Sequence, residues 1–287
     1  MVCKTKGRTK VINSQGKTEE SMISEMSFRE RAVLFATLSS IAYMDKKGAK
    51  REAKKLGFNT VEFYDKDGAQ AYRFMNKKDL VIACRGTQPT EWNDIKADLK
   101  AIPVMAETVG RVHKGFKKEV DDLWPMVLED LERKVNQDKN VWFTGHSLGA
   151  AMTTIMASRC QDVHHNVCEV YTYGSPRVGW GRYVRSLKVT HHRFVNNNDI
   201  VTRVPLWIMG YRHHGRRHYF NRKGQLGFSD IRDRILGMWE GWKKGRIDSI
   251  ADHDIGQYIV NCEDIPAHKE IRHKMGFWNG KIKEIMD

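Results

Sequence analysis

The sequence lacks several features that would place it in other classes of protein. Its five cysteines are scattered and odd in number, and no two of them form a Cys-x-x-Cys pair. Such usage argues against a disulfide framework or a zinc site and favours reduced thiols. No apolar stretch approaches the roughly 18 residues of a membrane-spanning helix. Disulfide-stapled, zinc-bound and membrane-spanning proteins are therefore disfavoured.

The N-terminus lacks the apolar core of a standard signal peptide, although its start is basic. We therefore expect a protein that is made and folded in the cytoplasm, and export by a route without an N-terminal signal stays open. Residues 1–26 show no periodicity and are expected to form a polar, basic extension. No linker divides the remainder, so residues 27–287 are expected to form a single domain.

Acidic residues are in deficit, because 35 Asp/Glu against 49 Lys/Arg give a formal net charge of +14. An excess of this kind bears on partners, such as an anionic surface, more than on the fold. The net charge is the only feature that suggests nucleic acid as a partner, because the sequence has no recognisable nucleic-acid-binding motif. Nucleic acid is therefore disfavoured as a partner. The apolar fraction of 40% is enough for a substantial core.

The most informative stretch is 141–151, where four strand-forming residues run into a Gly-x-Ser-x-Gly turn and then into a helical pattern. This strand–turn–helix context is what a nucleophile elbow requires. Gly145 and Gly149 leave room where a Cβ would clash in so tight a turn. Ser147 is therefore predicted to be a nucleophile at the head of a helix, with the amide of Leu148 aimed at a developing oxyanion. An ordinary glycine turn is the alternative.

A serine nucleophile needs a carboxylate and a base, which in this architecture follow it along the chain in that order. Asp199 lies in a polar loop just after a β run and is the best carboxylate, with a role in an Asx-turn as the alternative. His253, in a turn before a short apolar run, is favoured as the base, and His268 is its main rival. The other histidines after Asp199 are His213, His214, His218 and His273. The first three lie in residues 210–220, which alternate like a solvent-facing hairpin.

The surrounding pattern predicts an α/β fold with a mainly parallel sheet. Short β runs over 60–64, 70–74 and 80–84 are separated by turn sequences and predict an antiparallel meander at its start. Later β runs, including 167–173 and 192–195, alternate with helical patterns, which is typical of helices on both faces of the sheet. The first helix is expected after Ser27, which forms a capping box with Glu30.

Six motifs together resemble the class 3 lipase family, a group of triacylglycerol lipase-like α/β-hydrolases. They lie in the family's order at residues 81–87, 112–116, 144–151, 171–179, 197–205 and 252–258. The resemblance implies an α/β-hydrolase fold with Ser147 as nucleophile, Asp199 as orienting acid and His253 as base. It also implies an oxyanion hole formed by Thr87 and the backbone of Leu148.

The function implied by the resemblance is hydrolysis of carboxylic esters of lipids, as in an acylglycerol lipase or esterase, through an acyl-enzyme intermediate. No metal or organic cofactor is required for that chemistry. The alternatives within enzymes are a phospholipase and an esterase of short-chain or aryl esters. From a different class, the alternative is a catalytically dormant hydrolase scaffold that binds anionic membranes.

Two stretches of the sequence bear on how the protein would contact lipid. Fungal members of the family place an amphipathic lid helix after the oxyanion residue, but residues 88–100 are largely charged here. They favour a weak lid and a plain connecting helix about equally. Residues 203–246 hold 11 Lys/Arg against 3 Asp/Glu, interleaved with apolar residues. They predict either peripheral contact with an anionic membrane surface or packing on the core with a solvated charged face.

Overall fold

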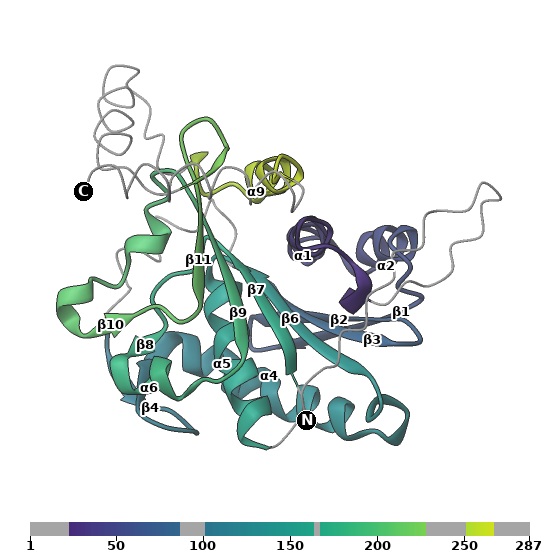
Figure 1. Cartoon of the computed structure of the whole chain (residues 1–287). Helices are drawn as coiled ribbons and strands as arrows, with labels where there is room; N and C mark the ends of the chain where they lie inside the picture. Colours follow the sequence, from purple (N-terminus) through teal and green to yellow (C-terminus); the bar gives the residue numbers. More distant parts are fainter. Residues whose placement is uncertain (1–22, 87–100, 164–166, 228–250, 267–287) are drawn as a thin grey trace, which may run out of the picture.

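The centre of the molecule is an eight-stranded sheet (Figure 1). A computed structural model describes residues 23–86, 101–163, 167–227 and 251–266. The sheet has the order β1 (Thr60–Lys66), β2 (Ala69–Met75), β3 (Asp79–Cys84), β6 (Asn140–His146), β7 (Val167–Tyr173), β9 (Thr190–Asn196), β11 (Arg216–Phe220) and β12 (Leu226–Gly227). Strands β1 to β3 pair antiparallel, and β3, β6, β7, β9 and β11 run parallel. The predicted antiparallel meander followed by a mainly parallel sheet is confirmed.

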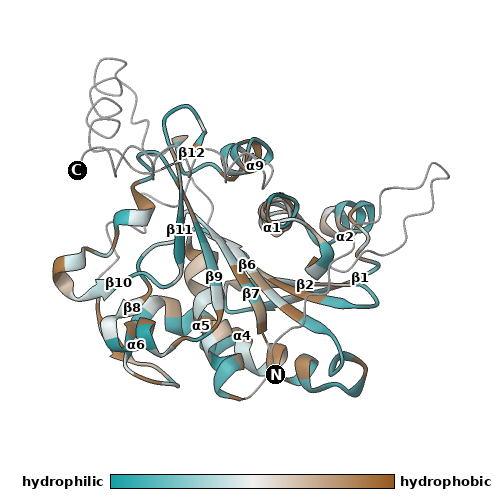
Figure 2. Cartoon of the chain, viewed as in Figure 1, coloured by the Kyte–Doolittle hydropathy of each residue, from teal (hydrophilic) through white to brown (hydrophobic). Residues whose placement is uncertain are grey.

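Helices cover both faces of this sheet, as predicted (Figure 1). One face carries α1 (Phe28–Ile41), α2 (Lys46–Lys55) and α9 (Ile255–Glu263), and the other carries α4 (Lys114–Glu132) and α5 (Leu148–Asp162). Figure 2 shows hydrophobic residues along the central strands β6 and β7 between these layers. The short helices are η1 (Ile23–Glu25), η3 (Lys134–Asn136), α6 (Gly181–Ser186), η4 (Val201–Arg203) and η5 (Trp207–Met209).

Strand β3 shows how the sequence specifies two cores. Its alternate residues Leu80 and Ile82 belong to the hydrophobic cluster beneath α4 and α5. Their neighbours Val81 and Ala83 belong to the cluster beneath α1 and α9. Because successive side chains of a strand point to opposite faces, a continuously apolar strand is stable only where helices cover both sides.

Helix α1 begins where the sequence predicted. The Ser27 side chain accepts a hydrogen bond from the amide of Glu30, and the Glu30 carboxylate accepts one from the amide of Ser27 at 2.7 Å. These two bonds satisfy amides that the first helical turn leaves without partners. The ring of Phe35 stacks on Tyr171 of β7 at 4.5 Å, which holds the helix against the parallel strands.

A second, four-stranded sheet was not predicted. It consists of β10 (Tyr211–Arg212), β8 (Gly179–Trp180), β5 (Arg111–His113) and β4 (Pro103–Met105), in that order. The reading of residues 210–220 as a solvent-facing hairpin was therefore wrong, because β10 joins this small sheet while β11 lies parallel to β9. His218, predicted to face solvent, is buried and stacks on Phe194. Alternation along a strand does not reveal which strand will pair with it.

The predicted polar extension, residues 1–26, is described only at its end. Ile23 is buried and its amide donates to the Asp79 carboxylate at 3.0 Å, so residues 23–26 pack against the sheet. The division at residue 26 and the single domain over 27–287 stay predictions. None of the helices in the described residues is both long and apolar enough to cross a membrane.

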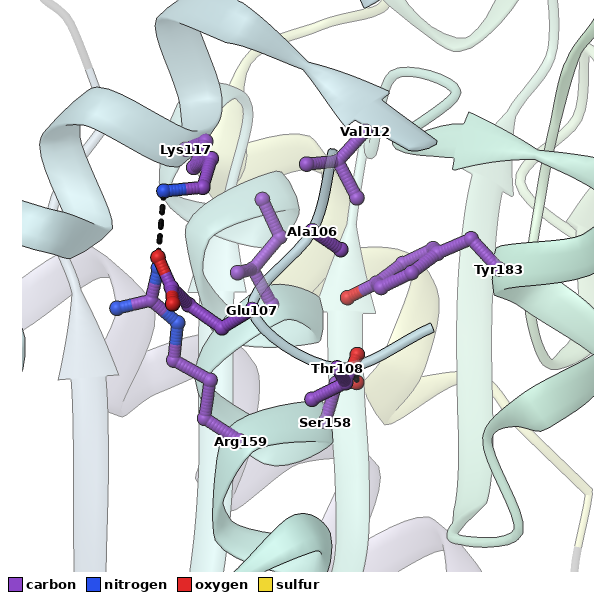
Figure 3. A pocket seen from close by; sticks show the side chains of 9 residues that line it. Ala106, Glu107, Thr108, Val112, Lys117, Ser158, Arg159 and Tyr183 are labelled. Atoms are coloured by element: carbon purple, nitrogen blue, oxygen red, sulfur yellow. Dashed lines mark hydrogen bonds and ion pairs between the residues drawn. The ribbon is translucent and has the colours of Figure 1, made fainter. Parts of the chain in front are cut away.

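A shallow pocket with about 170 Å³ of empty space lies between the β4–β5 hairpin and helices α4, α5 and α6 (Figure 3). Its charged groups are already paired, because Lys117 contacts the Glu107 carboxylate at 2.6 Å. The hydroxyls of Thr108 and Ser158 share a hydrogen bond at 3.1 Å. Arg159 is paired with Asp121. These contacts tie the hairpin to α4 and α5, and we assign them a structural role.

Candidate active site

The predicted elbow is present at the junction of β6 and α5. Ser147 joins the two elements with φ 59° and ψ −130°, a strained conformation for a residue with a side chain. A Cβ on Gly145 would lie 2.5 Å from the carbonyl oxygen of Gly149, and a Cβ on Gly149 would lie 2.2 Å from that of Cys84. Both glycines are therefore required by contacts within the elbow and with β3.

The predicted oxyanion residues differ in what the structure says of them. Leu148 is the first residue of α5, so its amide belongs to the helix turn that has no intrahelical acceptor. Thr87 lies outside the described residues. The residue before it, Gly86, comes so close to the elbow that a Cβ there would lie 3.2 Å from the Ser147 Cβ. The chain that leads into Thr87 thus passes beside Ser147, and the role of Thr87 stays a prediction.

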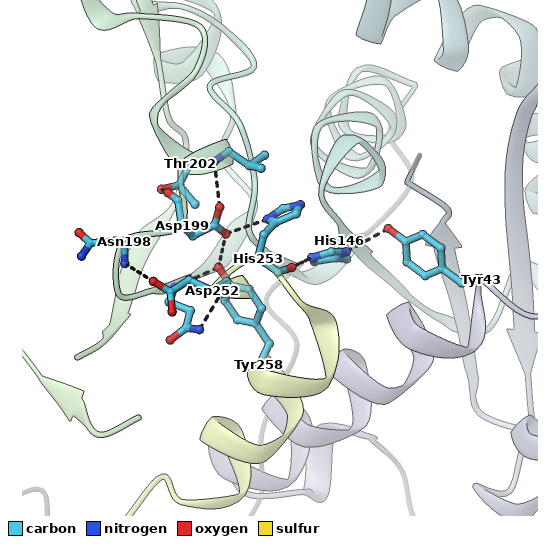
Figure 4. Close-up of polar contacts among 10 residues, drawn as sticks. Tyr43, His146, Asn198, Asp199, Thr202, Asp252, His253 and Tyr258 are labelled. Atoms are coloured by element: carbon cyan, nitrogen blue, oxygen red, sulfur yellow. Dashed lines mark hydrogen bonds and ion pairs between the residues drawn. The ribbon is translucent and has the colours of Figure 1, made fainter. Parts of the chain in front are cut away.

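The predicted acid and base lie together although 54 residues separate them (Figure 4). The Nδ1 atom of His253 is 2.9 Å from Oδ2 of Asp199, and both side chains are buried. A carboxylate oxygen only accepts hydrogen bonds, so Nδ1 carries the proton of the neutral ring and Nε2 carries the lone pair. This is the tautomer that a general base beside Ser147 needs.

Asp199 is held by two further donors. The hydroxyl of Tyr258 donates to Oδ2 at 2.6 Å, and the amide of Val201 donates to Oδ1 at 2.9 Å. Burial, together with the nearby Asp199 charge, raises the pKa of Tyr258 well above its ordinary value, so this phenol stays a donor. Gly174 lies beside the pair, where a Cβ would come within 2.7 Å of the His253 ring. The sequence analysis assigned no role to Tyr258 or Gly174.

The loop before His253 is anchored by the asparagines that precede Asp199. Asp252 accepts from the side chain of Asn197 at 3.0 Å and from the amide of Asn198 at 3.1 Å. Its backbone carbonyl accepts from the side chain of Asn196 at 3.0 Å. The asparagines after β9 thus hold the segment that carries His253 in place. The composition of this polar run alone did not indicate that role.

A second connection joins the elbow to the base through His146, the residue before Ser147. Its Nε2 atom is 2.7 Å from the carbonyl oxygen of His253, its Nδ1 atom is 2.9 Å from the Tyr43 hydroxyl, and its ring lies 4.4 Å from the His253 ring (Figure 4). The backbone of Gly86 also hydrogen-bonds the Tyr43 phenol. The His146 ring, at the end of β6, therefore bridges the segments that follow α1 and β3 and the segment that precedes α9. We call this set of contacts the bridge.

The protonation of this bridge follows from its partners. Burial, reinforced by the neighbouring His253, lowers the pKa of His146 well below its ordinary value, so the ring is neutral. A carbonyl can only accept, so Nε2–H donates to His253 and Nδ1 must accept from Tyr43. His146 was passed over in the sequence analysis because any residue can occupy the second position of a Gly-x-Ser-x-Gly turn.

The other candidate bases do not contact Asp199 in the described structure. His213 bonds to the carbonyl of Thr202 at 2.9 Å, His214 to His191 at 3.0 Å, and His218 to His192 at 3.0 Å. His268 and His273 lie outside the described residues. So do residues 88–100 and the part of the basic stretch 203–246 that follows residue 227. Within the described residues, no group of three or more His, Cys, Asp or Glu could hold a metal ion.

A family model described as Lipase (class 3) matches residues 81–209, which include most of β3, the elbow and Asp199. Residues 81–209 of the chain therefore belong to the class 3 lipase family. Class 3 lipase membership agrees with the motif resemblance seen in the sequence, and it accounts for the order in which the elbow and the Asp199 loop occur.

Two named proteins are similar to this chain in sequence. Toxin TseL of Vibrio cholerae serotype O1 is 27% identical over 244 residues, covering 69% of this chain and 37% of that protein. A lipase of Rhizomucor miehei is 32% identical over 164 residues, covering 53% of this chain and 44% of that protein. The chain thus spans less than half the length of both relatives. The solved structure of the Rhizomucor miehei triacylglyceride lipase has the same fold, with a TM-score of 0.63 at 21% identity, covering 81% of this chain and 96% of that one.

Proposed function

We propose that the protein is a serine hydrolase that cleaves carboxylic esters of lipids, as an acylglycerol lipase or esterase. The observation that carries the proposal is the buried contact of His253 with Asp199, tied through His146 to the elbow at Ser147. Membership of the class 3 lipase family supports the same chemistry.

In the proposed reaction, Nε2 of His253 takes the proton of Ser147 as the serine oxygen attacks the ester carbonyl. Asp199 stabilises the imidazolium that forms and keeps the ring in the required tautomer. The amide of Leu148 and the predicted donor Thr87 meet the charge on the tetrahedral oxygen, where the loss of one donor typically costs about 10²–10³ in turnover. The alcohol leaves with the proton from His253, and water releases the acid by the same steps. No cofactor takes part in these steps.

The decisive experiment is labelling by a fluorophosphonate probe. The wild type should be labelled and should hydrolyse p-nitrophenyl esters, and Ser147→Ala should lose both properties while it remains folded. Ser158→Ala, eleven residues further along α5 and also buried, is the matched control and should be labelled like the wild type. Labelling of the Ser147→Ala protein would rule out this serine as the nucleophile. A wild type that is neither labelled nor active would favour the dormant scaffold.

The substrate class within ester hydrolysis is part of the proposal. Acylglycerols come first, and phospholipids and short-chain or aryl esters are the alternatives. A screen of p-nitrophenyl esters by chain length, beside triolein and phosphatidylglycerol, separates the three. We also propose folding in the cytoplasm with signal-independent export as a second possibility, which fractionation of the producing culture would decide.

A further inference from the structure

Four consecutive large apolar side chains are exposed after β9. Leu206, Trp207, Ile208 and Met209 expose 54%, 63%, 75% and 45% of their surface. We call residues 206–209 the apolar tip, and Figure 2 shows it at the outer edge of the molecule beside β10. Single exposed apolar residues are ordinary on protein surfaces, whereas a contiguous group marks a contact site or a liability.

The backbone that carries the tip is fixed by two arginines. The Arg177 guanidinium donates to the carbonyl of Pro205 at 2.8 Å and also to that of Arg203. Arg212 donates to the carbonyl of Trp207 at 2.6 Å. The tip therefore presents its side chains from a hydrogen-bonded backbone, so their exposure is a built feature of the fold.

The base of the tip is bonded to the candidate active site. Val201 donates to the Asp199 carboxylate, and the side chain of Arg203 donates to that of Asn198 at 2.7 Å. Strands β6, β7 and β9 run parallel, so the loops that follow them leave from one edge of the sheet. The tip belongs to the loop that carries Asp199 and hence to the same edge as the elbow.

The neighbourhood of the tip is strongly basic. The segments that form and flank the small sheet are 101–114, 177–186 and 203–217, and they contain nine Lys/Arg against one acidic residue, Glu107. The exposed basic side chains among them are Arg111, Lys114, Arg182, Arg185, Arg212, Arg216 and Arg217. Glu107 is itself paired with Lys117. Within these three described segments the charge is therefore positive and nearly unopposed.

We propose that the apolar tip docks the protein on an anionic lipid surface, with Trp207 and Ile208 inserted and the surrounding arginines at the lipid phosphates. Insertion of apolar side chains beside basic ones is how peripheral segments bind such surfaces. A second copy of this chain would set positive charge against positive charge, whereas an anionic surface would compensate it. The proposal deepens the proposed lipid hydrolysis by naming its surface, but docking itself requires no turnover.

The test uses the full chain with Ser147→Ala, so that vesicles remain intact, and measures sedimentation with phosphatidylcholine vesicles with and without phosphatidylglycerol. The background should bind the anionic vesicles, and Trp207→Ser with Ile208→Ser should weaken that binding by about 100-fold, since burying each such side chain is worth roughly tenfold or more. Val135→Ser is the matched control, because Val135 is 70% exposed on η3, outside the small sheet and its flanks, and it should bind like the background.

Charge is tested separately at the exposed Arg182 and Arg185. Changing both to Gln should weaken anionic binding at low salt and matter little at high salt, because charges at the surface are screened within about 8 Å at physiological ionic strength. The residual binding at high salt should depend on Trp207 and Ile208. In the active enzyme, the tip double variant should keep hydrolysis of a soluble short ester and lose hydrolysis of esters in anionic vesicles.

Two results would overturn the proposal. One is equal sedimentation of the background and the tip double variant, or no sedimentation of either. The other is a dimer in light scattering that the tip variant converts to a monomer without a change in vesicle binding, which would make the tip a self-association surface. Thermal unfolding checks that the variants fold, and failure of the Ser147 test leaves these vesicle results unaffected.

Discussion

Two aspartates, Asp130 and Asp199, are buried in this protein but have different partners. Asp130, on α4, contacts the guanidinium of Arg73 and the hydroxyl of Tyr64. Asp199, after β9, contacts the imidazole of His253 and the hydroxyl of Tyr258. The two arrangements differ mainly in the basic side chain, which is an arginine beside Asp130 and a histidine beside Asp199.

The difference distinguishes a structural site from the proposed reactive one. Arginine remains protonated at any pH at which the protein folds, so the Asp130 charge is permanently compensated. An imidazole has two ring nitrogens, so while one is bonded to Asp199 the other can accept a proton and return it, as general acid–base chemistry requires. A buried carboxylate thus serves stability beneath α4 and is suited to proton transfer at the edge of the sheet.

The largest expected effect comes from Asp199→Asn. The amide oxygen is expected to keep the bond from the Val201 amide, which turns the NH2 group toward Nδ1 of His253. An NH2 group only donates, so the ring is expected to adopt the wrong tautomer. We expect kcat to fall by about 10⁴, the size of loss known for this change in a serine protease triad. Steady-state kinetics on a p-nitrophenyl ester, with circular dichroism to verify folding, measures it. An active Asp199→Asn protein would remove Asp199 from the proposed triad.

The reciprocal change, Asp130→Asn, should affect stability instead. It leaves the buried Arg73 without its charge partner, and breaking a buried pair on one side typically costs about 3–5 kcal/mol of unfolding free energy. Urea unfolding measures the loss, and kcat per folded molecule should remain that of the wild type. A large fall in kcat with unchanged stability would contradict the distinction between the two aspartates.

Acid should destabilise the histidine-rich part of the fold. Burial lowers the pKa of His146, His191 and His213 well below the ordinary value. The contribution of these neutral histidines to the free energy of unfolding is fully present above the pKa of the unfolded chain, about 6.5. It is lost as the pH falls from there toward the lowered pKa values of the folded protein. Each should cost about 1.4 kcal/mol per pH unit in that window. Urea unfolding at pH 7.5, 6 and 5 tests this, and an unfolding free energy that does not change with pH would contradict it.

The smallest expected effect is that of Tyr43→Phe, which removes the donor to Nδ1 of His146. Nε2–H of His146 is then less firmly directed at the His253 carbonyl, so we expect kcat to fall about tenfold or less, with KM unchanged, in line with roughly 1 kcal/mol for a hydrogen bond. Tyr64→Phe, at the Asp130 cluster, is the matched control and should lower stability without changing kcat. If both variants behave alike, Tyr43 has only a structural role.

The sequence by itself determined the features whose causes lie within a few residues. The capping box at Ser27 and the strand, turn and helix around Ser147 depend on backbone sterics and amide capping between near neighbours, and they were predicted correctly. The meander was also local, because its turns and its alternation are short-range. Chain order and local position suggested Asp199 and His253, and the family resemblance supported both; their catalytic roles stay predictions.

Only the tertiary structure decided which distant residues meet. Sheet topology brings His253 to Asp199 and Tyr43 to His146, and nothing in the spacing of those residues along the chain specifies a distance. The same reason explains the error at residues 210–220, where burial along β11 does not alternate and the partner strand, β9, lies earlier in the chain. It also explains the apolar tip, because exposure depends on what the rest of the fold leaves uncovered.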